Sequence, residues 1–197
     1  MPALTDFRGA ALVAALAATL AACDSQSPNG TTALSVRLKD APGDVQHAFV
    51  TITEVNLVGS GGVQVLTDTP VTTDLLTLAT DVLPLVQDVE VPSGTYHELR
   101  FKISGACLAV DDGNGGSTVY ATDGYDSTPC GGEAAGSLHA PSFAQSGLKV
   151  QMTGGALVLD TPTKILLVDF DVTQSFGHAA SGWVMHPVVT GAELQAQ

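Results

Sequence analysis

Four carboxylates are spaced so that they could do chemistry together. Asp169 and Asp171 are two residues apart in the run 164–172, which predicts a β-strand, so we expect both side chains on one face of it. Asp40 and Asp44 bracket an Ala-Pro-Gly turn after another predicted strand and could lie beside them. Such a group suits a hard cation such as Ca²⁺, which takes about six to eight oxygen ligands. Asp169 and Asp171, with Asp40, could also carry acid–base hydrolysis.

These carboxylates also have a structural explanation, which the sequence favours. Asp169 and Asp171 can hydrogen-bond turn backbone or pair with Arg100 or Lys102 on a neighbouring strand. Nothing else in the chain suggests a sugar cleft. Hydrolysis by Asp169 and Asp171 is therefore kept only as the alternative function.

A second acidic cluster lies in the run 111–116. Its Gly, Asp and Asn content is that of calcium-binding loops, so Asp111, Asp112 and Asn114 are candidate ligands for a metal ion. The run lacks the alternating acids and terminal Glu of an EF-hand, and the same composition marks a solvated turn. Ca²⁺ is the one cofactor that the sequence suggests.

Other catalytic patterns do not occur in the sequence. The five histidines show no spacing typical of a zinc site. There is no phosphate loop, dinucleotide fingerprint or Gly-x-Ser-x-Gly elbow. We therefore expect a protein that is not an enzyme.

The first 23 residues predict that the protein is located at the cell envelope. A charge-free run from Gly9 to Ala22 is shorter than the roughly 20 residues of a membrane-spanning helix, but it suits the helix of a secretion signal. The following Leu-Ala-Ala-Cys, ending at Cys23, resembles the lipobox of bacterial lipoproteins. The resemblance implies that residues 1–22 are removed and that Cys23 carries lipid in the inner or outer membrane, with the domain extracytoplasmic. The alternative is an ordinary signal peptide with a coincidental cysteine.

With Cys23 assigned to lipid, two cysteines remain. Cys107 and Cys130 would sit in an oxidising compartment, where disulfides persist. A bridge between them would close a loop of roughly 24 residues and stabilise the fold by about 3–4 kcal/mol. Two separate buried thiols are the alternative.

The elements that position these residues are predicted to be short strands. Leu34, Val36 and Leu38 alternate with polar residues at a period of two, and no long amphipathic helix follows residue 23. Many short strands with turn residues between them predict an all-β fold, an antiparallel β-sandwich. We expect a lipidated tether at 23–32, the sandwich at 33–192, a disulfide-pinned insertion loop at 107–147 and a tail at 193–197.

Seven motifs, taken in order, resemble the bacterial lipoprotein domain of unknown function 4382. They are Leu38-Lys39-Asp40-Ala41-Pro42 with Asp44, Val50-Thr51-Ile52-Thr53-Glu54-Val55, Asp74-Leu75-Leu76-Thr77-Leu78, Val91-Pro92-Ser93-Gly94-Thr95-Tyr96-His97-Glu98-Leu99-Arg100, Ala140-Pro141-Ser142, Asp169-Phe170-Asp171-Val172-Thr173-Gln174-Ser175 and Met185-His186-Pro187-Val188. The resemblance implies an extracytoplasmic β-sandwich of immunoglobulin-like or transthyretin-like character. It implies no reaction.

The net charge of −13 excludes one class of partner. Nucleic-acid binding rests on clustered Lys and Arg, which this acidic chain lacks. A rigid scaffold with one long polar loop instead favours a non-catalytic binding or structural module, with the 107–147 loop contacting a protein or glycan. Membrane lipid, through acylated Cys23, is the other expected partner.

Overall fold

The computed structural model describes residues 30–41, 45–141, 143–180 and 182–194, the side chains of residues 40 and 41 excepted. The predictions on the signal segment, on Cys23 and on Asp44 lie outside the described residues. The elements are β1 (Thr31–Ala41), β2 (His47–Gly59), β3 (Gly62–Thr67), β4 (Val71–Asp74), η1 (Leu75–Ala79), β5 (Leu83–Pro92), β6 (Gly94–Asp111), β7 (Ser117–Ala121), η2 (Thr128–Cys130), β8 (Gly136–His139), α1 (Phe143–Ser146), β9 (Leu148–Met152), β10 (Leu157–Leu159), β11 (Thr163–Asp171), α2 (Val172–Ser175), β12 (Phe176–Ala179), β13 (Gly182–Met185) and β14 (Val188–Leu194).

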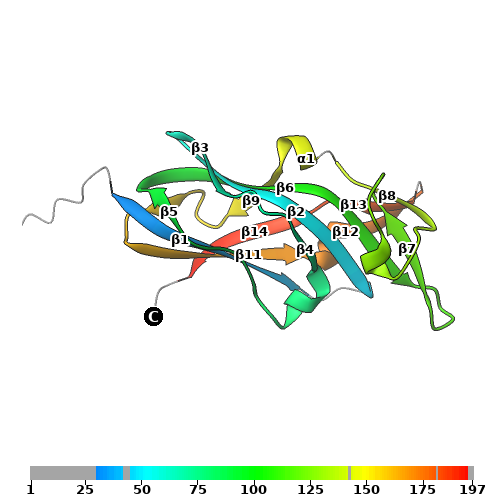
Figure 1. Ribbon diagram of the computed structural model, residues 1–197. Helices are drawn as coiled ribbons and strands as arrows, with labels where there is room; N and C mark the ends of the chain where they lie inside the picture. The colour runs from blue at the N-terminus through cyan, green and yellow to red at the C-terminus, as the bar shows by residue number, and fades with distance from the viewer. Residues whose placement is uncertain (1–29, 42–44, 142, 181, 195–197) are drawn as a thin grey trace, which may run out of the picture.

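The strands form two packed layers and a small extension (Figure 1). The first sheet is β5-β1-β11-β14, and the second is built around β2 and β6, with β3, β4 and β10 paired to them. Strand β9 pairs with β6 on one side and with β14 on the other, so it joins the two layers. The end sheet, β7-β8-β13-β12, continues from β6 at the end of the molecule away from the start of β1.

The core lies between the two layers. It takes Leu34 and Phe170 from the first sheet and Leu57 and Phe101 from the second, all fully or almost fully buried. These residues are the inward members of strands with a period of two, as the sequence predicts for β1. The all-β fold is confirmed.

Strand pairing is mixed rather than wholly antiparallel, which corrects one part of the prediction. Most pairs are antiparallel, but β1 and β11 run parallel, with Ala33 opposite Thr163. Parallel neighbours need a crossover connection, and here nearly the whole domain lies between the two strands. A local sequence pattern carries no signal for such a pairing.

The 107–147 segment is more ordered than the predicted loop. It contains β7, η2, β8 and α1, and the predicted disulfide is present, with a Cys107–Cys130 S–S distance of 2.08 Å. The hydroxyls of Tyr125 and Thr51 are 2.9 Å apart, which fixes the segment to β2. Gly105 makes this contact possible, because a Cβ there would collide with the Tyr125 ring.

Candidate functional site

The middle of strand β11, residues 165–168, is apolar on both faces. Leu166, Val168 and Phe170 are buried in the core, while Ile165 and Leu167 alternate with them and point to the outer face of the first sheet. A strand with one solvated face normally alternates apolar and polar residues, and a continuous apolar run is typical of a strand covered on both sides. The outer face of the first sheet is therefore the face on which a ligand is to be sought.

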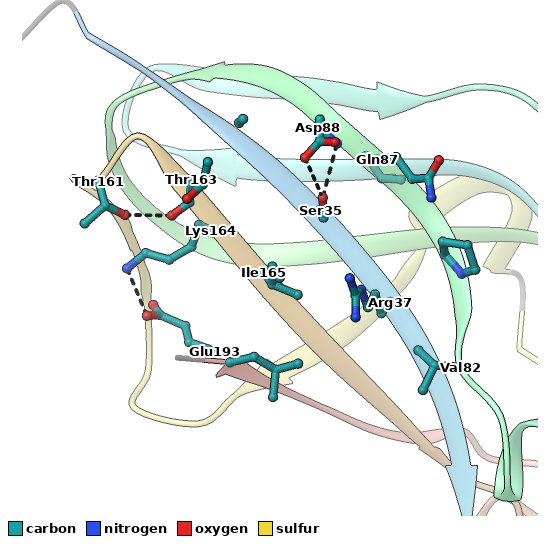
Figure 2. Close-up of a pocket in the computed structure, with 14 residues that line it drawn as sticks. Ser35, Arg37, Val82, Gln87, Asp88, Thr161, Thr163, Lys164, Ile165 and Glu193 are labelled. Carbon is teal, nitrogen blue, oxygen red and sulfur yellow. Dashed lines mark hydrogen bonds and ion pairs between the residues drawn. The ribbon is translucent and has the colours of Figure 1, made fainter. Parts of the chain in front are cut away.

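A groove with a volume of about 650 Å³ lies on this outer face, across β1, β5, β11 and β14. Figure 2 shows its two kinds of lining. Ile165, Leu194 and Val82 provide apolar surface, and Ser35 and Arg37 are among the polar side chains. The volume falls within the range of about 300–1,000 Å³ that small-molecule sites occupy.

Arg37 is the distinctive charge of the groove. Among the described residues it is the one Lys or Arg side chain with no ion pair. In Figure 2 it lies beside Ile165, and no interaction joins it to the other side chains drawn. An unpaired guanidinium is a free fork of N–H donors, a geometry that matches a carboxylate.

A β-bulge shapes one wall of the groove. Gln87 and Asp88 of β5 together face Ser35 of β1, where the pairing register shifts. Asp88 has a φ of 48°, an uncommon conformation for a non-glycine residue. It is held there by Ser35, whose hydroxyl donates to Asp88 Oδ1 and accepts from the Asp88 N–H, both at 3.2 Å.

The other end of the groove is neutralised by its own ion pairs. Lys164 Nζ lies 2.9 Å from Glu193 Oε2 and 3.6 Å from Asp160 Oδ1. The Lys164 side chain is only 15% exposed. Of the two described cations that line the groove, Arg37 is thus the one that remains available to a ligand.

The outer face of the second sheet is different. Its charges compensate one another: Lys102 pairs with Glu54 at 2.9 Å, and Arg100 and Lys149 pair with Glu98 at 2.7 and 3.1 Å. The hydrogen bond from Arg100 lowers the pKa of Glu98, and Lys149 adds to the effect. A hydrogen bond from Lys102 likewise lowers the pKa of Glu54. The charged side chains named on this face therefore already have partners of opposite charge.

Asp169 and Asp171, the members of the predicted carboxylate group whose side chains are described, do not line the groove. Asp169 Oδ2 pairs with Lys39 Nζ at 2.7 Å, and Asp171 accepts the Gln174 N–H at 3.0 Å as the N-cap of α2. Asp171 therefore bonds turn backbone, as the structural explanation predicts. Asp169 has a different partner from the predicted Arg100 or Lys102, because the parallel register places Lys39 opposite it.

Asp40 can be placed only by its backbone. It lies opposite Phe170 in the register between β1 and β11. The described part of the chain brings together no group of three or more His, Cys, Asp or Glu side chains able to hold a metal ion.

Asp111 and Asp112 bond the backbone of their own turn. Asp111 Oδ1 accepts the Gly113 N–H at 2.6 Å, and Asp112 Oδ1 accepts those of Asn114 and Gly116 at 2.7 and 3.0 Å. These hydrogen bonds, that from Asn114 first, lower the pKa of Asp112. Asn114 Nδ2 donates to the Asp112 carbonyl. The arrangement is that of the solvated turn that the sequence offers as the alternative to calcium.

A second, smaller cavity of about 250 Å³ lies where the 107–147 segment meets β6. Ser104, Thr122, Asp123, Phe143 and Met185 are among its lining residues. It places a concave surface within the segment that the sequence predicts as a contact region.

The sequence analysis did not predict the groove, nor the contact of exposed His47 with the buried Asp74. Asp74, almost fully buried, accepts the Ala48 N–H and lies 2.6 Å from His47 Nδ1. The groove had one usable signal, the four consecutive apolar residues 165–168, because a strand with a solvated face should not contain such a run.

Among the described residues, no helix is both long and apolar enough to cross a bilayer. A family model described as "Domain of unknown function (DUF4382)" matches residues 31–187. The match confirms the resemblance drawn from the seven motifs. Searches of curated proteins and of solved structures returned no match.

Proposed function

We propose that this chain, which belongs to the family described as Domain of unknown function (DUF4382), is a non-catalytic binding module. It takes a small ligand in the groove of the first sheet. The module is held at the bacterial cell envelope by lipid on Cys23, with the domain extracytoplasmic in the inner or outer membrane.

The groove is the observation that carries this proposal. It combines a volume of about 650 Å³ with apolar surface from Ile165, Leu194 and Val82 and with the unpaired Arg37. Ligand sites are typically concave and largely apolar, with a few polar groups that fix orientation. The second sheet, whose charged residues pair among themselves, has no such combination among its described residues.

Two observations support the proposed location at the cell envelope. The Leu-Ala-Ala-Cys sequence ending at Cys23 resembles a lipobox, and the Cys107–Cys130 disulfide suits an oxidising compartment. The 107–147 segment remains a proposed second contact, for a protein or glycan, because the disulfide and Tyr125 hold it rigidly on the scaffold.

The geometry gives no support to the alternative, an envelope hydrolase using Asp169 and Asp171. A catalytic pair needs a cleft and one carboxyl group with a raised pKa. Asp169 is neutralised by Lys39, Asp171 caps α2, and neither lines the groove.

Photo-crosslinking in living cells tests the groove. Val82 lines the groove and Val63 lies away from it on β3; both are exposed, by 45% and 56%, so replacing either leaves the core intact. We expect Val82→p-benzoylphenylalanine, after irradiation, to yield intact protein carrying a small-molecule adduct of defined mass. The matched Val63→p-benzoylphenylalanine protein should carry none. No adduct at position 82, or the same adduct at both positions, would refute the groove as the binding site.

A further inference from the structure

We infer that the ligand of the groove is an amphipathic monocarboxylate, whose carboxylate binds the Arg37 guanidinium and whose apolar body lies on Ile165 and Leu194. This inference rests on the proposed function and adds the chemical class of the ligand.

The charge of the ligand follows from the ion pairs of the chain. The described lysines and arginines other than Arg37, namely Lys39, Arg100, Lys102, Lys149 and Lys164, each have a carboxylate within 2.7–3.1 Å. In a chain with a net charge of −13, acidic partners for Arg37 are plentiful. Arg37, the one described Lys or Arg left without a carboxylate, lines the groove, where a ligand can supply that carboxylate.

The same surroundings favour one negative charge over two. Lys164 is already neutralised by Glu193 and Asp160, and Asp88 adds a further carboxylate to the wall. A phosphate monoester, which carries nearly two charges at neutral pH, would leave one of them facing these acids. A single carboxylate matches Arg37 and can accept two parallel N–H bonds from it.

The apolar part of the ligand follows from the strand register. Leu194 of β14 lies opposite Ile165 of β11, so the two side chains form a continuous apolar surface. Across the groove, Val82 adds a further exposed apolar side chain. An uncharged, flexible hydrocarbon chain covers such a surface without leaving any polar group unpaired.

Equilibrium dialysis with two matched probes tests the class of ligand. The lipidated full chain is reconstituted in phosphatidylcholine vesicles and dialysed against radiolabelled octanoate or octanamide, with protein-free vesicles to correct for partitioning. The probes share the chain and differ in charge. We expect octanoate to bind about tenfold or more tighter, which is the scale of hydrogen bonds to a charged group.

Three variants assign this preference to the groove. Arg37→Gln should weaken octanoate binding to the level of octanamide and leave octanamide unchanged, and Arg37→Lys should retain part of the preference. Lys149→Gln also removes one positive charge, but from a side chain that is 65% exposed and lies outside the groove. It should leave both affinities unchanged. Thermal unfolding of each variant checks that it is folded.

The outcomes separate the two proposals. Equal binding of octanoate and octanamide, or octanoate binding that survives Arg37→Gln, would overturn the monocarboxylate. So would tighter binding of octyl phosphate, a phosphate monoester measured in the same dialysis. If neither probe binds while position 82 still gives a small-molecule adduct, the monocarboxylate is overturned and the groove is upheld. If neither probe binds and no adduct forms, both are overturned.

Discussion

At the scale of single residues, Glu98 shows how the ion pairs of the second sheet make stability depend on pH. Arg100 and Lys149 both reach its carboxylate, and the hydrogen bond from Arg100 is the largest cause that lowers its pKa below the ordinary value of 4.5. A carboxylate with a lowered pKa in the folded state stabilises the fold above its unfolded pKa. That stabilisation is lost as the pH falls through the folded-state value.

We therefore expect Glu98→Gln to lower the free energy of unfolding at pH 7 by about 0.5–1 kcal/mol, the scale of solvent-screened ion pairs. Below the folded-state pKa the variant and the original chain should become equally stable. Urea denaturation at a series of pH values measures both. Glu133→Gln, at an exposed position with no ion pair among the described residues, is the control and should have little effect. A difference that persists unchanged at pH 3 would contradict the assignment.

The residues also show what local patterns can predict. The alternation of Leu34 and Val36 with Ser35 gives the correct inward and outward faces of β1, and counting cysteines gives the disulfide. Local chemistry likewise favours a backbone partner for Asp171, which caps α2. Each of these depends on neighbours in sequence or on composition alone.

The groove could not be predicted in the same way. Ser35 meets Asp88, and Ile165 meets Leu194, only because of the strand register. The pairing of Lys39 with Asp169 also depends on the register, in this case the parallel one between β1 and β11. A side-chain period of two indicates which face a residue occupies, but it does not indicate which strand lies beside it.

At the scale of elements, the disulfide determines how well the end sheet is held. Cys107 lies within β6 and Cys130 ends η2, with 23 residues of separation, so the bridge fixes β7 and the turns after it to the second sheet. The hydrogen bond between Tyr125 and Thr51 and that from the Ala106 N–H to Thr122 Oγ1 fix the same segment.

The double variant Cys107→Ala, Cys130→Ala should lose about 3 kcal/mol of unfolding free energy, because the unfolded chain gains the freedom of the open loop. Hydrogen exchange should rise in 117–139 well before it rises in β1 and β11, since the bridge lies in a separate buried cluster with Ala109, Val119 and Ala121. Equal loosening of both sheets, or no loss of stability, would contradict this role. Reduction of the unmutated protein should reproduce the effect.

At the scale of the whole molecule, the proposed lipid anchor would place the groove and the end sheet at different distances from the membrane. The described chain begins at Gly30, seven residues after Cys23, and β1 leads directly from there into the groove at Ser35. The groove would therefore stay near the membrane surface, while the end sheet lies at the opposite end of the molecule (Figure 1).

Replacing the proposed anchor tests this arrangement. We expect the original chain to take up labelled palmitate and to sediment with membranes. The Cys23→Ser variant should do neither, and the single-site control Cys107→Ser should do both. Uptake of the label by Cys23→Ser would show that lipid is attached elsewhere.

The parallel pairing of β1 with β11 has a consequence for the order of assembly. Ala33 has no β11 neighbour until Thr163 and the residues after it have been made. A chain emerging from its amino end must therefore carry its first strand incompletely paired through most of synthesis. Contacts this distant in sequence slow folding, so we expect the first sheet, and with it the groove, to close late.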